Sequence, residues 1–172
     1  MKKLLAVALL SAFAAAPALA ADAGGYAFAE LGAASLTNAP TFSNPGVFGF
    51  GGGYRFSRSV AAELGITAFG DSTSYVYADT LNLASFHPAV VGIFPVNDQF
   101  GLFGKLGLAF NSEKFTYSNS YSQTSLYYAL GVQINFNRQI GMRAQYESFG
   151  DFDNYPQPIS ATAFSLGVVF NF

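Results

Sequence analysis

Apolar side chains recur at every second position along most of the chain beyond residue 46. In the segment 47–56, Phe48, Phe50 and Phe56 alternate with glycines and with Arg55. A period of two predicts β-strands with unlike faces, because successive side chains of a strand point to opposite sides. The same alternation runs through five further segments, at residues 60–68, 100–110, 126–136, 140–147 and 162–172.

Two more strands are predicted from weaker patterns. Segment 25–35 fits a strand with Glu30 on one face and Leu31 with several alanines on the other. Segment 80–94 contains Pro88, and no single parity suits its whole length, so a β-bulge is predicted there. The total is eight strands, in agreement with the even strand number of bacterial single-chain membrane barrels.

The connections between these strands alternate in length. Those at 57–58, 97–98 and 137–139 are tight, and the others run to roughly ten residues, as in outer-membrane barrels with short periplasmic turns and longer external loops. A soluble β-sandwich also alternates, but the strand lengths, the loop asymmetry and the N-terminal segment favour a barrel. We therefore predict an all-β fold, an eight-stranded antiparallel up-and-down transmembrane β-barrel over residues 21–172.

The first twenty residues have the form of a signal peptide. Residues 1–3 are short and basic, residues 4–16 are apolar, and Ala18-Leu19-Ala20 has the small-x-small form of a cleavage site. The alternative is a retained anchor, but a helix needs about 20 apolar residues to span a bilayer. We predict a signal peptide at residues 1–20, a mature chain beginning at Ala21, and export to the outer membrane.

The charged residues are few and unevenly placed. Without Lys2 and Lys3, six basic residues remain against ten acidic ones, a net charge of −4 with no basic cluster suited to nucleic acid. No cysteine is present, which excludes disulfides and thiolate chemistry. Six charged side chains fall on the glycine-rich strand faces, where we predict a structural network in the lumen. They are Glu30, Arg55, Glu63, Lys105, Arg143 and Glu147. The other charges, Glu113 and Asp151 among them, are assigned to the N-terminus, turns and long loops.

Catalysis on lipids is the sharpest alternative function. A hydrolase or acyltransferase of this kind needs a base beside a serine and an acid to orient that base. The only imidazole is that of His87, which is expected mid-strand, several residues deeper than Asp71-Ser72. We therefore interpret His87 as non-catalytic and predict no enzyme activity. One histidine and scattered carboxylates also predict no metal site and no cofactor.

A narrow ion-conducting pore and a surface-loop adhesin or ligand binder remain open. The interior of eight strands is just wide enough for side chains to fill, so conduction beyond small ions is not expected. Tyrosines stand among Ser, Thr, Asn and Gln in the expected loops, a composition that recognition loops use. They are Tyr75, Tyr77, Tyr117, Tyr121 and Tyr155.

Several segments in order carry a resemblance to a known family. They are Gly52-Gly53-Tyr54-Arg55 with Ala62-Glu63-Leu64-Gly65, Phe94-Pro95-Val96-Asn97-Asp98 with Lys105-Leu106-Gly107, Gly131-Val132-Gln133 with Met142-Arg143-Ala144-Gln145-Tyr146, and residues 165–172. Together they resemble the transmembrane domain of the OmpA family, across nearly all of the predicted mature chain.

The resemblance implies an interior ion-pair cluster that differs from the family pattern. Glu63 and Arg143 match two of its four lumenal charges, whereas Gln133 stands at the place of the second acid and Val91 near that of the lysine. The network is therefore expected to be rewired through three other lumenal charges, Arg55, Lys105 and Glu147.

The end of the sequence looks like the signal read by the outer-membrane assembly machinery. Phe170 and the terminal Phe172 alternate with smaller residues, as in that signal. The resemblance further implies a monomer in contact with outer-membrane lipid and lipopolysaccharide. The function expected is non-enzymatic, in the envelope structure or in surface contact with a host or surface ligand of unknown identity.

Overall fold

The computed structural model describes residues 23–38, 43–70, 72–73, 80–115, 121–152 and 158–172. Within these ranges all regular structure is β. The strands are β1 (Gly24–Thr37), β2 (Gly46–Arg55), β3 (Val60–Phe69), β4 (Ser72–Thr73), β5 (Thr80–Pro95), β6 (Phe100–Phe115), β7 (Tyr121–Asn135), β8 (Ile140–Asp151) and β9 (Ser160–Asn171).

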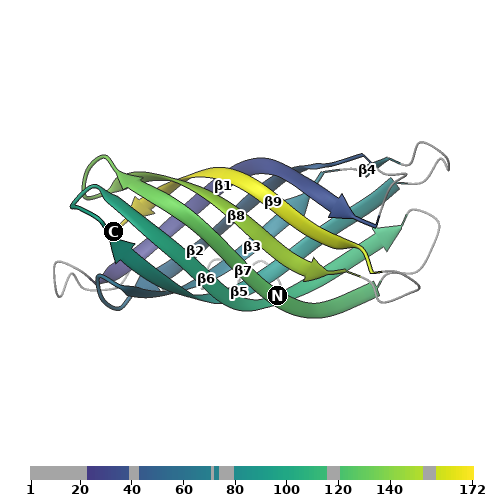
Figure 1. The fold of residues 1–172 in the computed structure, drawn as a ribbon, viewed down its shortest axis with the longest axis horizontal. Coiled ribbons are helices and arrows are strands. Elements are labelled where there is room, and N and C mark those ends of the chain that lie inside the picture. Colours follow the sequence, from purple (N-terminus) through teal and green to yellow (C-terminus); the bar gives the residue numbers. More distant parts are fainter. Residues whose placement is uncertain (1–22, 39–42, 71, 74–79, 116–120, 153–157) are drawn as a thin grey trace, which may run out of the picture.

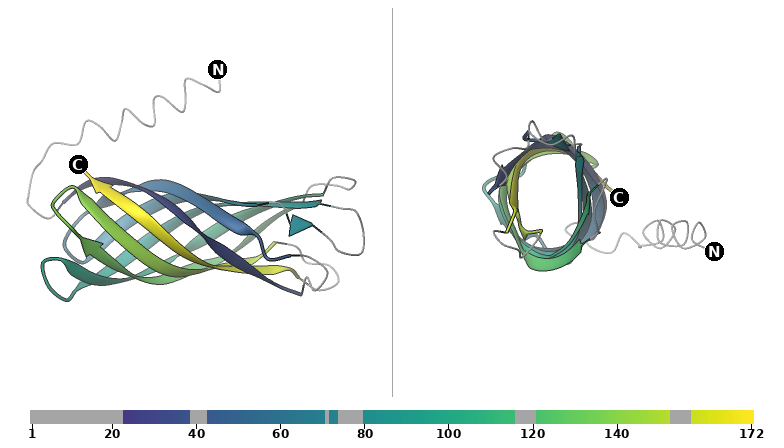
Figure 2. Two further views of the ribbon diagram at one scale, coloured as in Figure 1. Left: turned by 90° about the horizontal axis from the view of Figure 1, so that it is seen from above. Right: turned by 90° about the vertical axis from the view of Figure 1, so that its right-hand side faces the viewer.

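Eight long strands close on themselves to form a barrel. The hydrogen-bonded order is β3-β2-β1-β9-β8-β7-β6-β5, and β3 also pairs with β5, so all neighbours are antiparallel and no long strand is left with a free edge. Figure 1 shows the tilted strands from the side, and the end-on view in Figure 2 shows a closed ring. The short β4 pairs with the beginning of β5. The predicted eight-stranded antiparallel barrel is confirmed.

The two faces of the strands follow the predicted parity. On β3, for example, Leu64 and Ile66 are exposed on the outer wall, whereas Glu63, Gly65 and Thr67 are buried inside. Such a wall suits hydrocarbon, because closure satisfies the backbone hydrogen bonds and the large apolar side chains face lipid. Small inner residues leave room for the few large polar side chains in the lumen.

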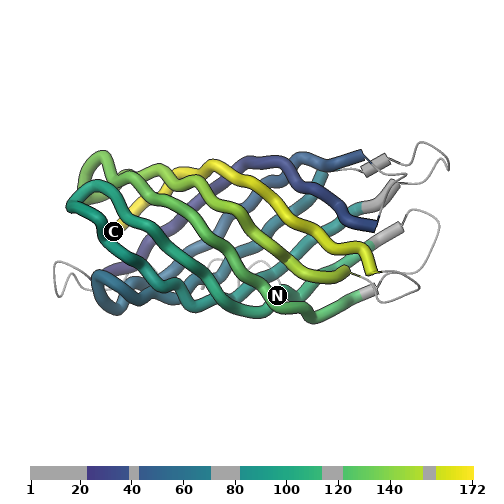
Figure 3. The backbone as a smooth tube through the Cα atoms, in the orientation of Figure 1, coloured from purple at the N-terminus to yellow at the C-terminus, as the bar shows by residue number. Residues whose placement is uncertain are grey.

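One turn geometry occurs three times at a single end of the barrel, the end at which the chain terminates (Figure 3). In each turn a polar side chain accepts hydrogen bonds from the backbone N–H groups two and three residues later. These side chains belong to Ser57, Asn97 and Asn137. Short side chains of this kind favour tight turns because they satisfy local backbone donors.

The predicted bulge in the strand around Pro88 is wrong. The register of β5 with β3 runs unbroken from Val60 opposite Gly92 to Ala68 opposite Ala84. No single parity was visible in the sequence because β5 also places apolar side chains inside, with Leu83 and Val91 buried among other apolar residues. Pro88 lies on the outer face, and the pairing with β6 lapses only there and at the preceding residue.

A bulge occurs instead in β8, between Ser148 and Gly150. Gly150 has a φ of 65°, a left-handed conformation that glycine adopts without a steric penalty. The Nδ2 of Asn111 donates to the carbonyls of Phe149 and Asp151 at 2.8 and 2.9 Å, which holds the irregular backbone in place. Phe149 is the residue of the bulge without a partner in β9, and its side chain lies in the lumen, where it is fully buried.

Three charged residues assigned to loops belong to strands, namely Glu113, Lys114 and Asp151. Glu113 lies within β6 and is buried, and Asp151 is the last residue of β8. At the loop end of the barrel, which lies opposite the three tight turns, these strands continue beyond the apolar stretch that marks the lipid-facing wall. The polar residues there made the strands look shorter in the sequence than they are.

Candidate functional site

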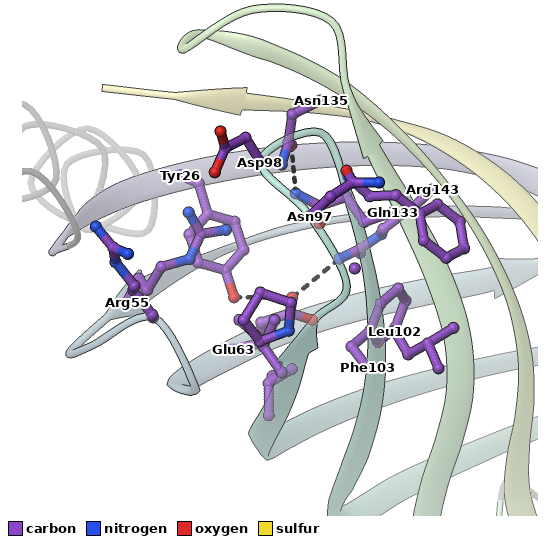
Figure 4. A pocket seen from close by; sticks show the side chains of 16 residues that line it. Tyr26, Arg55, Glu63, Asn97, Asp98, Leu102, Phe103, Gln133, Asn135 and Arg143 are labelled. Atoms are coloured by element: carbon purple, nitrogen blue, oxygen red, sulfur yellow. Dashed lines mark hydrogen bonds and ion pairs between the residues drawn. The ribbon is translucent and has the colours of Figure 1, made fainter.

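The lumen is the candidate site, and an ion-pair network of Glu30, Glu63, Lys105 and Arg143 crosses it. The carboxylate of Glu63 contacts the Nζ of Lys105 at 2.6 Å and an Nη of Arg143 at 2.9 Å. The hydroxyl of Tyr26 donates to the same carboxylate at 2.8 Å (Figure 4). Glu63 therefore holds residues from β1, β6 and β8 together across the barrel.

Arg143 links this carboxylate to a second one. Its other Nη lies 3.1 Å from Glu30, and the Nε2 of Gln145 donates to Glu30 at 2.9 Å. The guanidinium carbon also lies 3.7 Å from the centre of the Phe28 ring, within the range of a cation–π contact. Arg143 is only 3 % exposed, so these contacts replace water almost completely.

The other two predicted lumenal charges lie outside the ion pairs. Glu147 accepts hydrogen bonds from Tyr127 at 2.6 Å and from Ser165 at 2.9 Å, and no cation of the described chain lies within ion-pair distance of it. Arg55 sits over the ring of Tyr26, with 5.6 Å between guanidinium carbon and ring centre. Of the three residues named for rewiring, only Lys105 joins the network.

Sequence reasoning missed the neutral partners of these charges. Tyr26, Gln145 and Ser165 each hydrogen-bond a lumenal carboxylate. Their inward parity was readable from the sequence, since Tyr26 shares its strand face with Glu30. Which inward side chains meet across the barrel depends on strand register and tilt, which no local pattern reveals.

An aromatic plug, formed by Phe69, Tyr127, Phe149 and Phe152, fills the lumen toward the loop end. Phe69 makes edge contacts with both Phe149 and Phe152, at ring-centre distances of 5.2 and 5.5 Å. Tyr127, Phe149 and Phe152 are all 0 % exposed. The plug and the ion-pair network occupy successive levels of the lumen, with the plug nearer the loop end.

His87 is lumenal and packs against this plug. Its ring stacks on Tyr127 at 4.4 Å, and its Nε2 lies 3.0 Å from the hydroxyl of Thr67. Neither a serine nor a carboxylate hydrogen-bonds the imidazole among the residues that the structure covers. The imidazole is therefore packed among aromatic rings with a threonine hydroxyl as its hydrogen-bond partner, and no carboxylate of the described residues orients it.

The opposite end of the lumen contains a cavity of about 360 Å³, which we call the turn-end cavity. It is bounded by the β2–β3 and β5–β6 turns, and the Glu63–Arg143 contact forms its floor (Figure 4). Its polar lining also includes Arg55 and Arg58. The network thus separates a hollow turn end from a packed loop end.

The remaining predicted residues lie at the two ends. Phe170 and Phe172 are exposed on the outer wall near the turn end, with ring centres 5.5 Å apart. Tyr121 begins β7, and its side chain lies outside the described part of the chain. The other loop tyrosines, Tyr75, Tyr77, Tyr117 and Tyr155, and the predicted signal peptide also fall outside it.

Two kinds of feature are absent from the described ranges. They contain no group of three or more His, Asp and Glu side chains arranged to hold a metal ion. They also contain no helix of the length and apolarity needed to cross a membrane.

Solved structures share this architecture. Neisserial surface protein A superposes with a TM-score of 0.70 at 18% identity, covering 87% of this chain and 99% of that one. Ail, the attachment invasion locus protein of Yersinia pestis, gives 0.62 at 18% identity, covering 88% and 99%. The N-terminal β-barrel domain of Pseudomonas aeruginosa OprF gives 0.58 at 16% identity, covering 86% and 97%. At these identities the likeness is one of fold.

Sequence comparison supplies the family. No curated protein matches the chain. The profile of the family described as outer membrane protein beta-barrel domain matches residues 5–172, which is nearly the whole sequence. The chain is therefore a β-barrel protein of the outer membrane and belongs to the outer membrane protein beta-barrel domain family.

Proposed function

We propose that this protein is a closed, non-enzymatic barrel whose role is envelope-structural or surface contact, carried by its two ends and its outer wall. The observation that supports this is the double obstruction of the lumen. The ion-pair network and the aromatic plug lie one after the other along the axis, and their side chains are almost completely buried.

Opening such a lumen is energetically costly. A continuous water path requires the buried Glu63 to leave two cations at once, and separating one partner from a buried pair costs about 3–5 kcal/mol. The plug must then also lose its ring contacts. Passage of large solutes is therefore disfavoured. His87 is buried against the plug with the Thr67 hydroxyl as its partner, and it lacks a hydrogen-bonded carboxylate in the described chain to orient it as a hydrolytic base.

The proposed partners follow from the exposed parts. The apolar outer wall contacts outer-membrane lipid and lipopolysaccharide, and Phe170 with Phe172 contacts the assembly machinery during insertion. The barrel pairs all its long strands internally, so it needs no second copy to protect an edge, which is consistent with a monomer.

Conductance of the purified protein tests the closed lumen. We expect no large, stable channels in planar bilayers and no swelling of liposomes in sugar solutions. A general-diffusion porin reconstituted in parallel shows that the assay detects an open lumen. Large, stable conductance of the unmodified protein would contradict the closed lumen and would show that the protein forms a pore.

Surface-loop recognition is the second candidate. Ail, a fold relative with a TM-score of 0.58 and 20% identity, was solved in complex with the heparin analogue sucrose octasulfate. Here the sequence segments that follow the long strands, away from the tight turns, carry the acidic residues Asp71, Asp79, Asp151 and Asp153 and the basic residue Lys114. That balance disfavours a polyanion and favours a neutral or cationic ligand held by the loop tyrosines.

A whole-cell adhesion assay separates this candidate from a purely structural role. Cells expressing the protein are compared with cells expressing a Tyr117→Ser/Tyr155→Ser variant at equal surface levels. Reduced attachment of the variant supports recognition by the loops. Equal attachment of both, at the level of cells without the protein, supports the structural role.

A further inference from the structure

The turn-end cavity contains positive charge that the ion-pair network does not use. Its charged lining comprises three arginines and two acids, Arg55, Arg58, Arg143, Glu63 and Asp98. Glu63 is already in contact with both Lys105 and Arg143. Asp98 is then the one lining carboxylate of the described chain outside the network, and Arg55 lies outside the network as well.

Arg55 is the arginine best placed to bind a ligand. It is the last residue of β2, lies on the lumenal face and is half-buried beside Tyr26 (Figure 4). Its Nε atom is buried and has no hydrogen-bond acceptor among the described residues. A buried donor without an acceptor is unfavourable, and because the Arg55 side chain lines the cavity, an anion there can engage this donor after a shift of the side chain.

A second unused donor lies at the floor of the same cavity. The Nε of Arg143 is also buried without an acceptor, although both of its Nη atoms are engaged by carboxylates. Side-chain amides of Asn97, Gln133 and Asn135 complete the polar lining. The cavity volume of 360 Å³ falls in the range of about 300–1,000 Å³ that small-molecule sites occupy.

We propose that the turn-end cavity binds a phosphate group, with Arg55 as its principal anchor and Arg143 at its floor. Guanidinium groups suit this ligand because their planar N–H donors match the oxygens of a phosphate. Tight turns mark the periplasmic end of an outer-membrane barrel, so the phosphate comes from a periplasmic solute or from a lipid headgroup of the inner leaflet.

The test follows the arginine Nε–Hε resonances of the full-length mature protein, folded in dodecyl maltoside without phosphate. Inorganic phosphate and glycerol 3-phosphate are the probes. We expect a saturable shift of the Arg55 resonance and none at Arg138, an exposed arginine in the β7–β8 turn outside the cavity. Arg55→Gln should weaken binding by about tenfold or more, since a charge-assisted hydrogen bond is lost, whereas Arg138→Gln should leave it unchanged.

A lipid arm distinguishes the two sources. The Arg55 resonance is compared in nanodiscs of phosphatidylglycerol and of a galactolipid that carries no phosphate, without free phosphate in either. A shift confined to phosphatidylglycerol assigns a lipid headgroup, and saturation by the soluble probes assigns a periplasmic solute. Absence of a shift in both arms, or an equal shift at Arg138, would overturn the proposal. If Arg55→Gln does not fold, these resonances of the unmodified protein decide the matter.

Discussion

Substitutions in the ion-pair network should lower the free energy of unfolding by different amounts, depending on which charge each one leaves unpaired. Arg143→Met leaves Glu30 without its cation, and Glu63→Gln leaves Lys105 without its acid. Lys105→Met leaves no charge alone, because Glu63 keeps Arg143 at 2.9 Å. We therefore expect Lys105→Met to be the mildest of the three.

The size of the effects follows from burial. Glu63 and its two partners are at most 6 % exposed, so a charge left alone has little access to water. Breaking a buried pair by removing one partner costs about 3–5 kcal/mol, which is the loss expected for Glu63→Gln and for Arg143→Met. The double variant Glu63→Gln/Lys105→Met removes both members of one pair, so it should cost less than its two single changes together.

Urea titration of the barrel folded in lipid vesicles measures these differences. The folded fraction is followed by its gel mobility and by circular dichroism, and the free energy of unfolding is obtained by linear extrapolation. Strict additivity of Glu63→Gln and Lys105→Met would show that the two side chains do not interact. A Lys105→Met variant as damaged as Arg143→Met would refute the ranking.

Three further outcomes are expected. Leu106→Arg places a charge on the outer wall, where Leu106 is 61 % exposed, and should lower the free energy of unfolding by about 2–4 kcal/mol, with Leu106→Met as the near-neutral control. Gly107→Ser should also destabilise the barrel in the same urea assay, because an added Cβ meets the backbone of Pro88 and comes within 2.8 Å of the Cα of Ala89. Gly104→Ala is the milder control, because its Cβ meets the side chain of Leu130 at 3.4 Å and the carbonyl oxygen of Ala129 at 3.8 Å. Mass spectrometry of the outer-membrane fraction should find a chain that starts at Ala21, and a chain that starts at Met1 would contradict the predicted export.

Gly107 also shows where sequence reasoning fails. From alternation alone it is a lumen-facing glycine, at which serine should be far milder than arginine at Leu106. The close approach of β5 at Pro88 results from strand packing, and the residues next to Gly107 in the sequence do not predict it.

The parity of most strands was predictable because lipid and lumen select opposite residue types. That contrast weakens toward the loop end, where the plug makes the lumen apolar. The bulge predicted in β5 was wrong for this reason, whereas Glu113 was placed in a loop because polar residues follow the apolar stretch before β6 ends. Inward charges were readable one at a time, but the isolation of Glu147 from every described cation depends on distances across the barrel.

The pairing of β1 with β9 has a consequence for how the protein is made. Tyr26 lies opposite Asn171, so the seam of the barrel joins the two ends of the chain and its contacts have the largest sequence separation in the molecule. Such contacts form late in folding, because a long loop must close, at a cost in conformational entropy, before the contacts contribute to stability. A growing or truncated chain without β9 therefore exposes two unpaired strand edges, at β1 and at β8, whose backbone groups are unsatisfied in hydrocarbon. Closure of the barrel in the membrane therefore requires β9, which pairs with both of these edges.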